Sequence, residues 1–326
     1  MKAIVYKRYG PPDVLELKQV EKPIPKENEI LVKVKATTVT VADIRSRGFT
    51  VPPAFWLPAR ITLGLRQPKK EILGMELAGE VELVGKNVKR FKRGDQVFAA
   101  SLSGFGAYAE YKCLEEDGPV AIKPSNITYG EAAAIPIGAR TALYFLRKAD
   151  IKSGQSVLVY GASGSVGSYA VQIAKYLGAN VTGVCSTANL ELVKSLGADN
   201  VMDYTAKDFS STVETYDVIF EAVNKSSFSA CMKLLKNNGT YINVTEPLPS
   251  IQMLWTKLTS RKKLILSRNS PETPEALNFL KGLVEMGKLR VVIDRYYSFN
   301  EIVEAHKYVE KGHKKGNVVI NVEHNN

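Results

Sequence analysis

"VYGASGSVGSYAVQIAKYLGANVTGVCST", residues 159–187, is the stretch from which we infer the fold. It continues the apolar segment "SVLVY", which is typical of a short buried strand. The segment "SVGSYAVQIAKYLG" then places apolar residues on one helical face, and Gly178 marks the expected end of that helix. "NVTGVC" follows as a second strand. The stretch therefore predicts a strand, a turn of small residues, a helix and another strand.

The turn in this stretch resembles a dinucleotide-binding fingerprint, G-x-G-x-x-G. Its three positions are Ala162, Gly164 and Gly167. We expect the alanine to allow the tight turn, Gly164 to let the backbone approach a pyrophosphate, and Gly167 to let the helix pack on the strand. The N-terminus of the helix adds free N–H groups and partial positive charge. The motif predicts a site for a dinucleotide.

The end of the second strand indicates which dinucleotide binds. An NAD site requires Asp or Glu about 20 residues after the glycines, to accept from the ribose 2′-OH. Here Ser186 and Thr187 occupy that zone, and no residue from Val184 to Ala188 is acidic. Hydroxyl groups can donate to a 2′-phosphate. The sequence therefore favours NADPH.

The rest of the chain divides into two patterns. Segments such as "EILVKVKATTV" and "ELAGEVELVG" alternate apolar and polar residues near the N-terminus, as half-buried strands do. After Pro124, strands and helices alternate up to a sixth strand, "KLILS", at residues 263–267. This alternation predicts an α/β fold with a doubly wound parallel sheet of Rossmann type. The tail does not extend the alternation, so we expect it to fold back onto the first domain.

Composition bounds the function of the 326-residue chain. Hydrophobic residues make up 45% and charged residues 24%, and no apolar run approaches the roughly 18 residues of a membrane span. Three isolated cysteines and the lack of an apolar leader favour the cytoplasm. The net charge is +11, but the densest basic run, residues 86–93, is interpreted as a solvated loop. We expect neither a nucleic acid nor a membrane as a partner.

Several longer segments extend this interpretation. "MKAIVYKRYGPPDVLEL", "ATTVTVADIRSRG", "LGMELAGEVELVGKNVKRFKRGDQVF" and "GHKKGNVVI" join the nucleotide motif along nearly the whole chain. Together they resemble the medium-chain dehydrogenase/reductase superfamily, and within it the zinc-independent quinone oxidoreductase (zeta-crystallin-like) group. The resemblance implies a GroES-like β-rich catalytic domain, residues 1–123 and 285–326, and a dinucleotide-binding Rossmann domain, residues 124–284. It also implies that the cofactor binds between the two domains.

The resemblance further implies which residues bind the cofactor. The turn and the first helical residues would bind the pyrophosphate. The end of the second strand and the residue after the third strand would bind the 2′-phosphate. The ends of later strands would bind the rest of the cofactor. Asn317 departs from the lysine usual after the last glycine. The full set is Ser163, Gly164, Ser165, Val166, Gly167, Ser186, Thr187, Tyr204, Val223, Val244 and Gly316.

Zinc-dependent members of the superfamily hold a catalytic metal with Cys and His. In this chain Thr40 stands at the position of the loop cysteine and Met75 at that of the histidine. Thr and Met are poor zinc ligands, so we expect no metal. Without a Lewis acid, hydride transfer to an already electrophilic acceptor is the reaction that asks least of the protein. A quinone, an activated carbonyl or an activated alkene is an acceptor of this kind.

Substrate contacts are expected in two places. Thr40 is the candidate catalytic residue, because the related enzymes carry an asparagine there that contacts substrate or nicotinamide ribose. Residues 48–72 form a long Pro-rich loop in which Phe49, Phe55 and Trp56 are candidates for an apolar substrate pocket. A strand-end threonine and a loop packed on the domain body are the structural alternatives.

Four functions remain open at this stage. The first is an NADPH-dependent, zinc-free quinone or enone reductase. An enoyl-thioester or alkenal double-bond reductase would use the same hydride step, and a non-catalytic NADPH-binding or structural protein would use none. A zinc alcohol dehydrogenase is disfavoured by Thr40 and Met75. By resemblance we expect a homodimer, formed through the exposed edge of the nucleotide sheet.

Overall fold

The computed structural model describes residues 1–102, 104–206, 209–267 and 273–324. The chain folds into two compact units. Unit 1 comprises Met1–Ile137, Glu272–Glu285 and Ile293–Asn326, and unit 2 comprises Gly138–Pro271 and Met286–Val292. Residues 124–137, which the sequence-based ranges assign to the nucleotide domain, make their contacts in unit 1. The domain ranges themselves stay a prediction.

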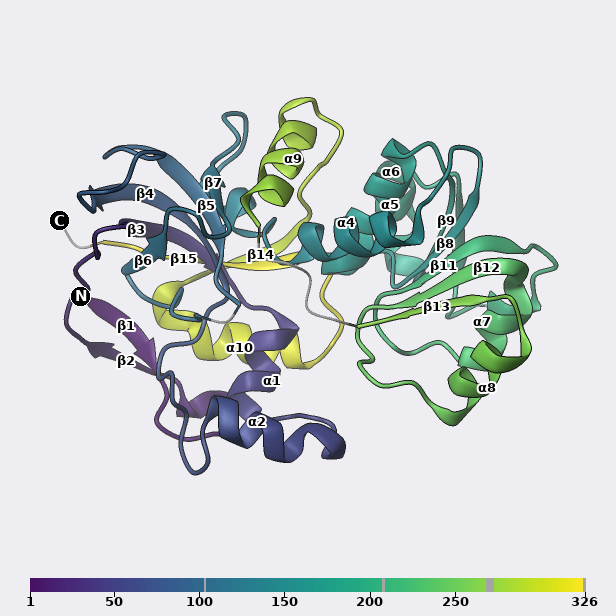
Figure 1. The fold of residues 1–326 in the computed structure, drawn as a ribbon, viewed down its shortest axis with the longest axis horizontal. Helices are drawn as coiled ribbons and strands as arrows, with labels where there is room; N and C mark the ends of the chain where they lie inside the picture. Colours follow the sequence, from purple (N-terminus) through teal and green to yellow (C-terminus); the bar gives the residue numbers. More distant parts are fainter. Residues whose placement is uncertain (103, 207–208, 268–272, 325–326) are drawn as a thin grey trace. The chain divides into compact units, whose positions relative to one another are not determined.

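Unit 2 is built on a six-stranded parallel sheet in the order β10-β9-β8-β11-β12-β13. Its strands are β8 (Ser156–Tyr160), β9 (Asn180–Cys185), β10 (Asn200–Asp203), β11 (Tyr216–Glu221), β12 (Leu235–Asn243) and β13 (Lys263–Leu266). Helices α4 (Gly138–Ala149), α5 (Ser165–Tyr176) and α6 (Leu190–Ser195) lie on one face, and α7 (Phe228–Leu234) and α8 (Ile251–Thr259) lie on the other (Figure 1). The predicted doubly wound sheet is confirmed.

Burial explains this arrangement. The side chains of Val157, Leu158 and Val159 in β8 are fully buried, as a strand covered on both faces requires. Residues 167–174 of α5 are buried as well, and the helix ends just before Gly178, whose φ is +85°. Glycine adopts this left-handed conformation without the strain that a Cβ would cause.

Unit 1 contains a seven-stranded sheet in which β14-β15-β3-β4-β5-β7 are neighbours and β6 also pairs with β3. A separate antiparallel pair joins β1 and β2. The last strand lies antiparallel to β3, with Val319 opposite Thr38, so the tail folds back onto the N-terminal strands as predicted. The bounds are β1 (Lys2–Val5), β2 (Glu16–Gln19), β3 (Glu29–Thr38), β4 (Glu76–Val84), β5 (Gln96–Ala100), β6 (Tyr111–Glu115), β7 (Val120–Ile122), β14 (Ile293–Ser298) and β15 (Asn317–Asn321).

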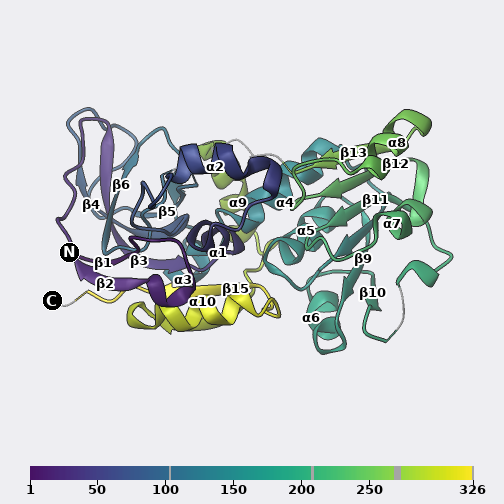
Figure 2. The same cartoon turned by 90° about the horizontal axis from the view of Figure 1, so that it is seen from below.

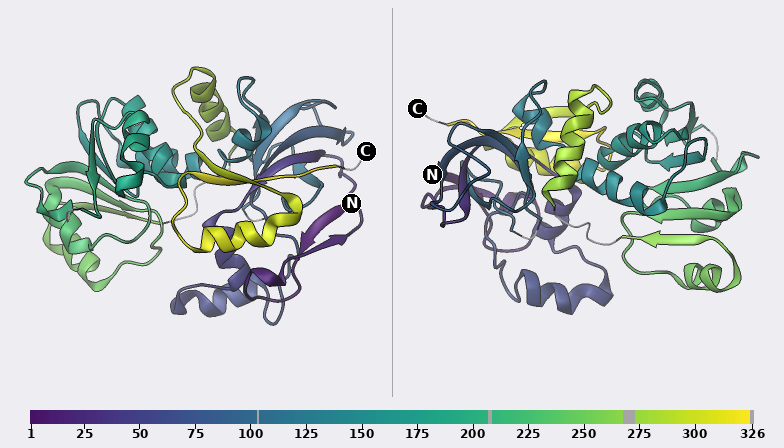
Figure 3. Two further views of the ribbon diagram at one scale, coloured as in Figure 1. Left: turned by 180° about the vertical axis from the view of Figure 1, so that it is seen from behind. Right: turned by 45° about the horizontal axis from the view of Figure 1, so that its top comes forward.

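Two helices of unit 1 carry residues of the site. Helix α1 (Val41–Gly48) starts directly after β3, and α10 (Ile302–Glu310) packs against it and along β15 (Figures 2 and 3). The remaining helices are α2 (Trp56–Leu63), α3 (Tyr129–Ala133) and α9 (Pro274–Glu285). Short 3-10 turns are η1 (Pro12–Val14), η2 (Pro53–Phe55), η3 (Thr187–Asn189), η4 (Phe209–Ser211) and η5 (Phe299–Glu301).

Segment 48–72 is therefore not a loop throughout. It contains η2 and α2, a helix in which no residue is buried. Four prolines and an aromatic-rich composition favoured a loop, but the run "WLPARITL" holds good helix formers after a proline in its first turn. Among the described residues, no helix is long and apolar enough to cross a membrane.

Candidate functional site

The turn after β8 depends on a glycine that the sequence comparison with G-x-G-x-x-G overlooked. Gly161 has a φ of +80°, and a Cβ there would lie 2.8 Å from Cγ1 of Val223. Its N–H donates to the carbonyl of Val184 at 3.0 Å. Ala162, which we assigned to the first glycine position, is instead a buried residue. The tight turn is made by Gly161, one residue earlier.

Gly167 has the role that the sequence predicts for it. A Cβ at this position would lie 2.0 Å from the carbonyl oxygen of Gly161, a distance that no real side chain tolerates. The absence of a side chain brings the first turn of α5 directly onto the β8 turn. Gly164 is the N-cap of the helix, and residues 163–166 are all partly exposed. This helix terminus presents backbone dipoles toward solvent, as a phosphate site requires.

Two further strand ends meet beside this turn. Glu221, the last residue of β11, is fully buried, and its carboxylate accepts the N–H groups of Val223 and Asn224 at 2.8 Å each. It also accepts from the backbone and hydroxyl of Ser226. Val244, after β12, donates its N–H to the Glu221 carbonyl at 3.1 Å. Glu221 thus holds the candidate residues Val223 and Val244 in place, a role that sequence reasoning did not assign.

The end of β9 holds the residues considered for the 2′-phosphate. Ser186 is the N-cap of η3, and its hydroxyl accepts from the amide of Asn189 at 3.1 Å. Thr187 donates to Asp203, a carboxylate at the end of the neighbouring strand β10. Tyr204 follows, with its ring 6.2 Å from that of Tyr160.

Asp203 is an acid that the sequence search missed. An acid that binds ribose is expected on β9, about 20 residues after the glycines, but the parallel pairing places Asp203 of β10 opposite Cys185. Hydrogen bonds from Thr187 and Thr205 lower the pKa of its carboxyl. An ionised carboxylate therefore lies next to Thr187. The signal was present in the sequence as the last residue of the third predicted strand.

Thr40 of unit 1 lies at the N-terminus of α1 and forms a capping box with Asp43. The Thr40 hydroxyl accepts the N–H of Asp43 at 3.1 Å and donates to Asp43 Oδ2 at 2.5 Å. The backbone N–H of Thr40 donates to the same oxygen at 3.0 Å. The other carboxylate oxygen, Oδ1, accepts from the N–H of Gly74 at 3.1 Å. Thr40 is partly exposed and Asp43 is fully buried.

Two buried carboxyl groups flank this end of β3. Burial raises the pKa of Asp43 to about 6 and that of Glu76 to about 7. Glu76 accepts from the hydroxyl of Thr38 and from the N–H of Ile137, the latter at 2.7 Å. The charge of Asp43 raises the pKa of Glu76 further. Both carboxyl groups therefore exchange protons near neutral pH.

A buried chain of polar groups lies behind Asp43. Arg47 donates from Nη1 to Nδ1 of His306 at 3.0 Å, and His306 Nε2 lies 3.2 Å from the hydroxyl of Tyr108. Tyr108 donates to the carbonyl of Thr38 at 3.2 Å and also lowers the pKa of Asp43. Burial and the Arg47 charge lower the pKa of His306 to about 3. His306 is therefore neutral, with its proton on Nε2.

The expected substrate-pocket aromatics gather around a cation. The ring of Phe49 lies 5.0 Å from that of Tyr9 and 6.3 Å from that of Trp56. The guanidinium of Arg60 stands 3.9 Å from the centre of the Phe49 ring and 5.2 Å from that of Trp56. Phe55 is half-buried in η2. The structure thus joins Phe49 and Trp56 through Arg60, a residue that we had not singled out.

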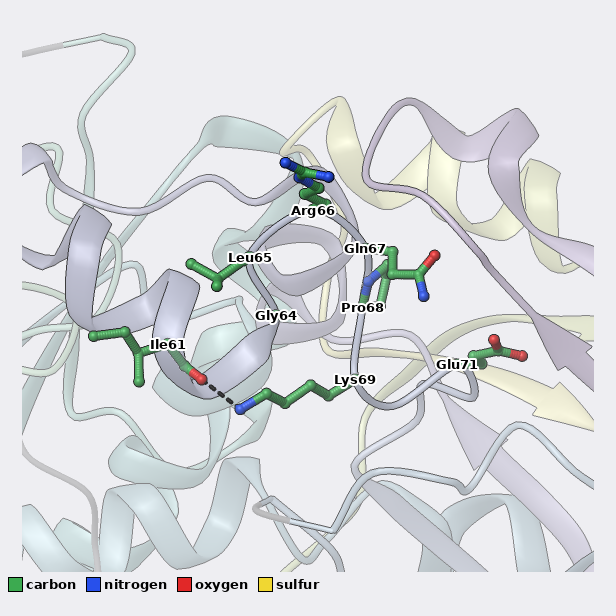
Figure 4. Close-up of a pocket in the computed structure, with 8 residues that line it drawn as sticks. All are labelled: Ile61, Gly64, Leu65, Arg66, Gln67, Pro68, Lys69 and Glu71. Atoms are coloured by element: carbon green, nitrogen blue, oxygen red, sulfur yellow. Dashed lines mark hydrogen bonds between the residues drawn. The ribbon is translucent and has the colours of Figure 1, made fainter.

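A pocket of about 460 Å³ lies beside this cluster, lined by residues 61 and 64–69 and by Glu71 (Figure 4). Lys69 closes one side by donating to the carbonyl of Ile61 at 2.6 Å, as the dashed line shows. Phe49, Phe55 and Trp56 do not line it. Its lining mixes apolar residues, such as Ile61 and Leu65, with charged ones, and it contains none of the three expected aromatic residues, so it is not the pocket that we expected.

Gly316, the candidate tail contact, begins the turn into β15 with a φ of +63°. Its carbonyl accepts from Nζ of Lys314 at 2.6 Å. Burial lowers the pKa of Lys314 to about 8, and the Glu76 carboxylate opposes that shift. Gly316 belongs to unit 1, with Thr40 and the aromatic cluster, whereas the phosphate-turn residues belong to unit 2.

Thr40 and Met75, which the family resemblance sets at the zinc-ligand positions, do not fit a metal. The oxygen of Thr40 is engaged by Asp43, and Met75 is buried in the apolar core of unit 1. Within the described ranges no three His, Cys, Asp or Glu side chains are grouped as a metal site would need. Met75 offers only a thioether in an apolar environment, which zinc does not select.

Comparison with known proteins places this geometry in a family. Residues 26–124 match the family described as "Alcohol dehydrogenase GroES-like domain", and residues 196–320 match the one described as "Zinc-binding dehydrogenase". The second description names a metal for which Thr40 and Met75 are unsuited.

Whole-length relatives extend the match. The chloroplast envelope quinone oxidoreductase homolog of Arabidopsis thaliana is 35% identical, over 98% of each chain. The chloroplastic NADPH-dependent alkenal/one oxidoreductase of the same plant is 32% identical, over 98% of this chain and 79% of its own. The solved quinone oxidoreductase of Coxiella burnetii superposes with a TM-score of 0.87 at 29% identity and 99% coverage of both chains. The chain therefore belongs to the quinone oxidoreductase-like group of the medium-chain dehydrogenase/reductase superfamily.

Proposed function

We propose that the chain is an NADPH-dependent, zinc-free oxidoreductase that transfers hydride to a quinone or to another activated carbonyl or alkene. One observation carries the proposal. The turn before α5 has glycines at positions with no room for a side chain, as a phosphate-binding turn does, and the same chain has Thr40 and Met75 at the zinc-ligand positions. The two relatives described above carry names that specify quinone and alkenal/one oxidoreductases, which supports this acceptor class. When bound, the reduced nicotinamide would supply the hydride.

The cofactor would be held mainly by unit 2. Ser163 to Val166 would hold the pyrophosphate at the start of α5, and Gly167 lets that helix approach. Val223 and Val244 would contact the adenosine or nicotinamide portions, and Gly316 would be the cofactor contact from the final strand. Each assignment is tested by titrating cofactor into single variants and following the quenching of protein fluorescence.

The preference for NADPH rests on Ser186, Thr187 and Tyr204. Ser186 presents a hydroxyl where NAD enzymes carry an acid, and Tyr204 is nearly half exposed beside it. Asp203 is the group that opposes this preference, because its charge would repel a 2′-phosphate. Comparing the dissociation constants of NADPH and NADH tests the assignment. Tighter binding of NADH would refute it.

Thr40 and the aromatic cluster would face the acceptor. Thr40 offers the partly exposed hydroxyl, and Phe49, Phe55 and Trp56 offer apolar surface suited to a planar molecule. The Arg60 guanidinium within that cluster would favour an acceptor that gains negative charge during reduction. Substituting Phe49 and Trp56 by alanine should raise the KM for the acceptor without changing the affinity for NADPH.

A panel of acceptors tests the function itself. NADPH oxidation would be followed with a small benzoquinone, an α,β-unsaturated ketone, an alkenal and an enoyl thioester. Turnover of the quinone or enone supports the proposal, and turnover of the alkenal or thioester alone supports the second candidate, a double-bond reductase. That candidate is favoured by the name of the alkenal/one relative. If NADPH binds but no acceptor is reduced, a non-catalytic binding role replaces both.

We also propose a homodimer formed through the edge of the nucleotide sheet. Strand β13 is the last strand in the sheet order, and α8 beside it exposes Ile251 and Leu258 at 86% and 83%. Exposed apolar residues next to an unpaired strand edge are typical of a self-association surface. Light scattering of the purified protein and of Leu258→Glu distinguishes a dimer from a monomer.

A cytoplasmic location is proposed on the cysteines alone. Cys113, Cys185 and Cys231 are all free in the structure, which fits a reducing compartment. The names of the plant relatives place those proteins in chloroplasts, so imaging of the tagged full-length protein decides the compartment.

A further inference from the structure

We propose that Asp43 stores the proton that the reduction consumes, and that the Thr40 hydroxyl is the group through which this proton reaches the reduced acceptor. The inference rests on the proposed function, since it assigns the proton that must follow the hydride. It makes Thr40 the catalytic residue and Asp43 a positioning and proton-supplying residue behind it.

The hydrogen bonds of Thr40 depend on the charge of Asp43. A hydroxyl has one proton to donate and two lone pairs with which to accept. With Asp43 ionised, the Thr40 proton is donated to Asp43 Oδ2, at 2.5 Å, and one lone pair accepts the Asp43 N–H, at 3.1 Å. In this state Thr40 has no proton left for a substrate.

Protonation of Asp43 reverses the shorter bond. Oδ2 then carries the proton and donates it to Thr40 Oγ1, which accepts it with the second lone pair. The Thr40 proton is released and is free to point toward solvent or a ligand. Thr40 is partly exposed, whereas Asp43 is fully buried, so Thr40 is the outward-facing member of the pair.

The groups around Asp43 set when this reversal happens. Gly74 N–H binds its Oδ1 at 3.1 Å, the Tyr108 hydroxyl lowers its pKa, and Tyr6 and Glu76 interact with its charge. Burial is the largest effect and raises the pKa of Asp43 to about 6. The protonated state of Asp43 is therefore about half populated near pH 6 and is still present at neutral pH.

His306 does not compete for the proton. Its Nδ1 accepts from Arg47 and its Nε2 proton faces Tyr108, so neither ring nitrogen is available as a base. Burial beside the Arg47 charge keeps it neutral. The hydrogen bonds among Arg47, His306 and Tyr108 thus leave no base there that could take the proton of Asp43. Thr40 is the neighbour that can pass this proton toward solvent or a ligand.

The step balances as follows. When bound, a reduced nicotinamide would supply the hydride, and the acceptor that receives it would be an enolate or phenolate anion. That anion takes the proton of Thr40 Oγ1 while Oγ1 takes the proton of Asp43 Oδ2. Thr40 ends as a neutral hydroxyl, Asp43 ends as a carboxylate, and water returns a proton to Asp43 through Thr40 after the product leaves.

Asp43→Asn tests the proposal, because an amide keeps an oxygen for the capping contacts but cannot release a proton. We expect kcat of the unaltered protein to fall about tenfold per pH unit above pH 6. The kcat of D43N should not depend on pH, and it should lie below that of the unaltered protein at pH 6 by a factor on the order of 10². NADPH affinity should stay within about twofold. Thr40→Val should match D43N, and Thr40→Ser should restore the activity and the pH profile.

The matched control is the capping box of α3, in which Glu131 accepts from Thr128 as Asp43 does from Thr40. Glu131→Gln changes a cap without touching the site and should leave kcat unaltered. Equal, pH-independent kcat values for D43N, E131Q and the unaltered protein would overturn the proposal.

An infrared measurement on the cofactor-free protein separates this inference from the proposed function. The carbonyl band of a protonated carboxylic acid should grow as the pH falls through about 6, and D43N should lack that part of the band. A panel without turnover refutes the proposed function, whatever the band does. Turnover with no titrating band assigned to Asp43 refutes the proton store alone.

Discussion

Acidification should destabilise unit 1 through His306. Both ring nitrogens of this histidine are engaged, by Arg47 and by Tyr108, and the ring is fully buried. Burial and the Arg47 charge lower the pKa of His306 to about 3 in the folded state, against an ordinary value of 6.5. Protonation would place a second positive charge 3.0 Å from the guanidinium nitrogen. The unfolded chain therefore binds a proton that the folded chain rejects.

The magnitude follows from the two pKa values. A lowered pKa contributes stability that is complete above the unfolded value, near 6.5, and that is lost as the pH falls toward the folded value, near 3. Between pH 7 and pH 4 this linkage removes about 3 kcal/mol from the free energy of unfolding. That is a large share of the roughly 5–15 kcal/mol that stabilises an ordinary domain.

His306→Gln isolates the effect, because glutamine can accept from Arg47 and donate to Tyr108 but does not titrate. The protein has two tryptophans, Trp56 in unit 1 and Trp255 in unit 2, so single-tryptophan variants report the two units separately. Urea unfolding between pH 4 and pH 7 should show a weaker pH dependence in H306Q, by about 3 kcal/mol, in the Trp56 signal.

The exposed His313 is the matched control, and His313→Gln should retain the pH dependence of the unaltered protein. If H306Q and the unaltered protein lost the same free energy of unfolding between pH 7 and pH 4, the conclusion that His306 stays neutral in the folded protein would be wrong. A difference seen in the Trp255 signal but not in the Trp56 signal would place the effect outside unit 1 and would equally contradict the reasoning.

Three further substitutions test other parts of the structure. Gly167→Ala should force the start of α5 away from the β8 turn and weaken NADPH binding by at least tenfold in a fluorescence titration, whereas Gly282→Ala, whose new Cβ meets open space, should not. Asp203→Asn should raise the ratio of NADPH to NADH affinity several-fold, since it removes a carboxylate beside Thr187; an unchanged ratio would place the 2′-phosphate elsewhere. Asp43→Asn should move the Glu76 titration in the infrared spectrum to lower pH, because it removes a like charge.

Local patterns account for the parts of the fold that could be predicted. The six strands of unit 2 and the helix after β8 follow from short apolar runs and a 3.6-residue period, both of which depend on neighbours in sequence. The return of the tail was predicted because residues after 290 break the alternation of strands and helices. The packing role of Gly167 could be predicted because its spacing from the strand fixes that role.

The parts that escaped prediction depend on pairing across the fold. Arg47, Tyr108 and His306 come from three distant segments, and no local pattern links them. Asp203 reaches Thr187 only because β10 pairs in parallel with β9. Gly161 and Ala162 are both small, and only the backbone conformation shows that the first makes the turn.

The order of strands in unit 1 bears on how the protein is synthesised. Strand β15, near the C-terminus, pairs with Ala36–Thr38 at the end of β3, whereas most of unit 2 is one continuous segment between them. At roughly 5–20 residues per second, that end of β3 waits on the order of tens of seconds for its partner. The nucleotide-binding unit can complete its sheet during this interval. Until β15 emerges, the N-terminal sheet carries an open hydrogen-bonding edge, which is where premature release or truncation would expose the nascent chain to aggregation.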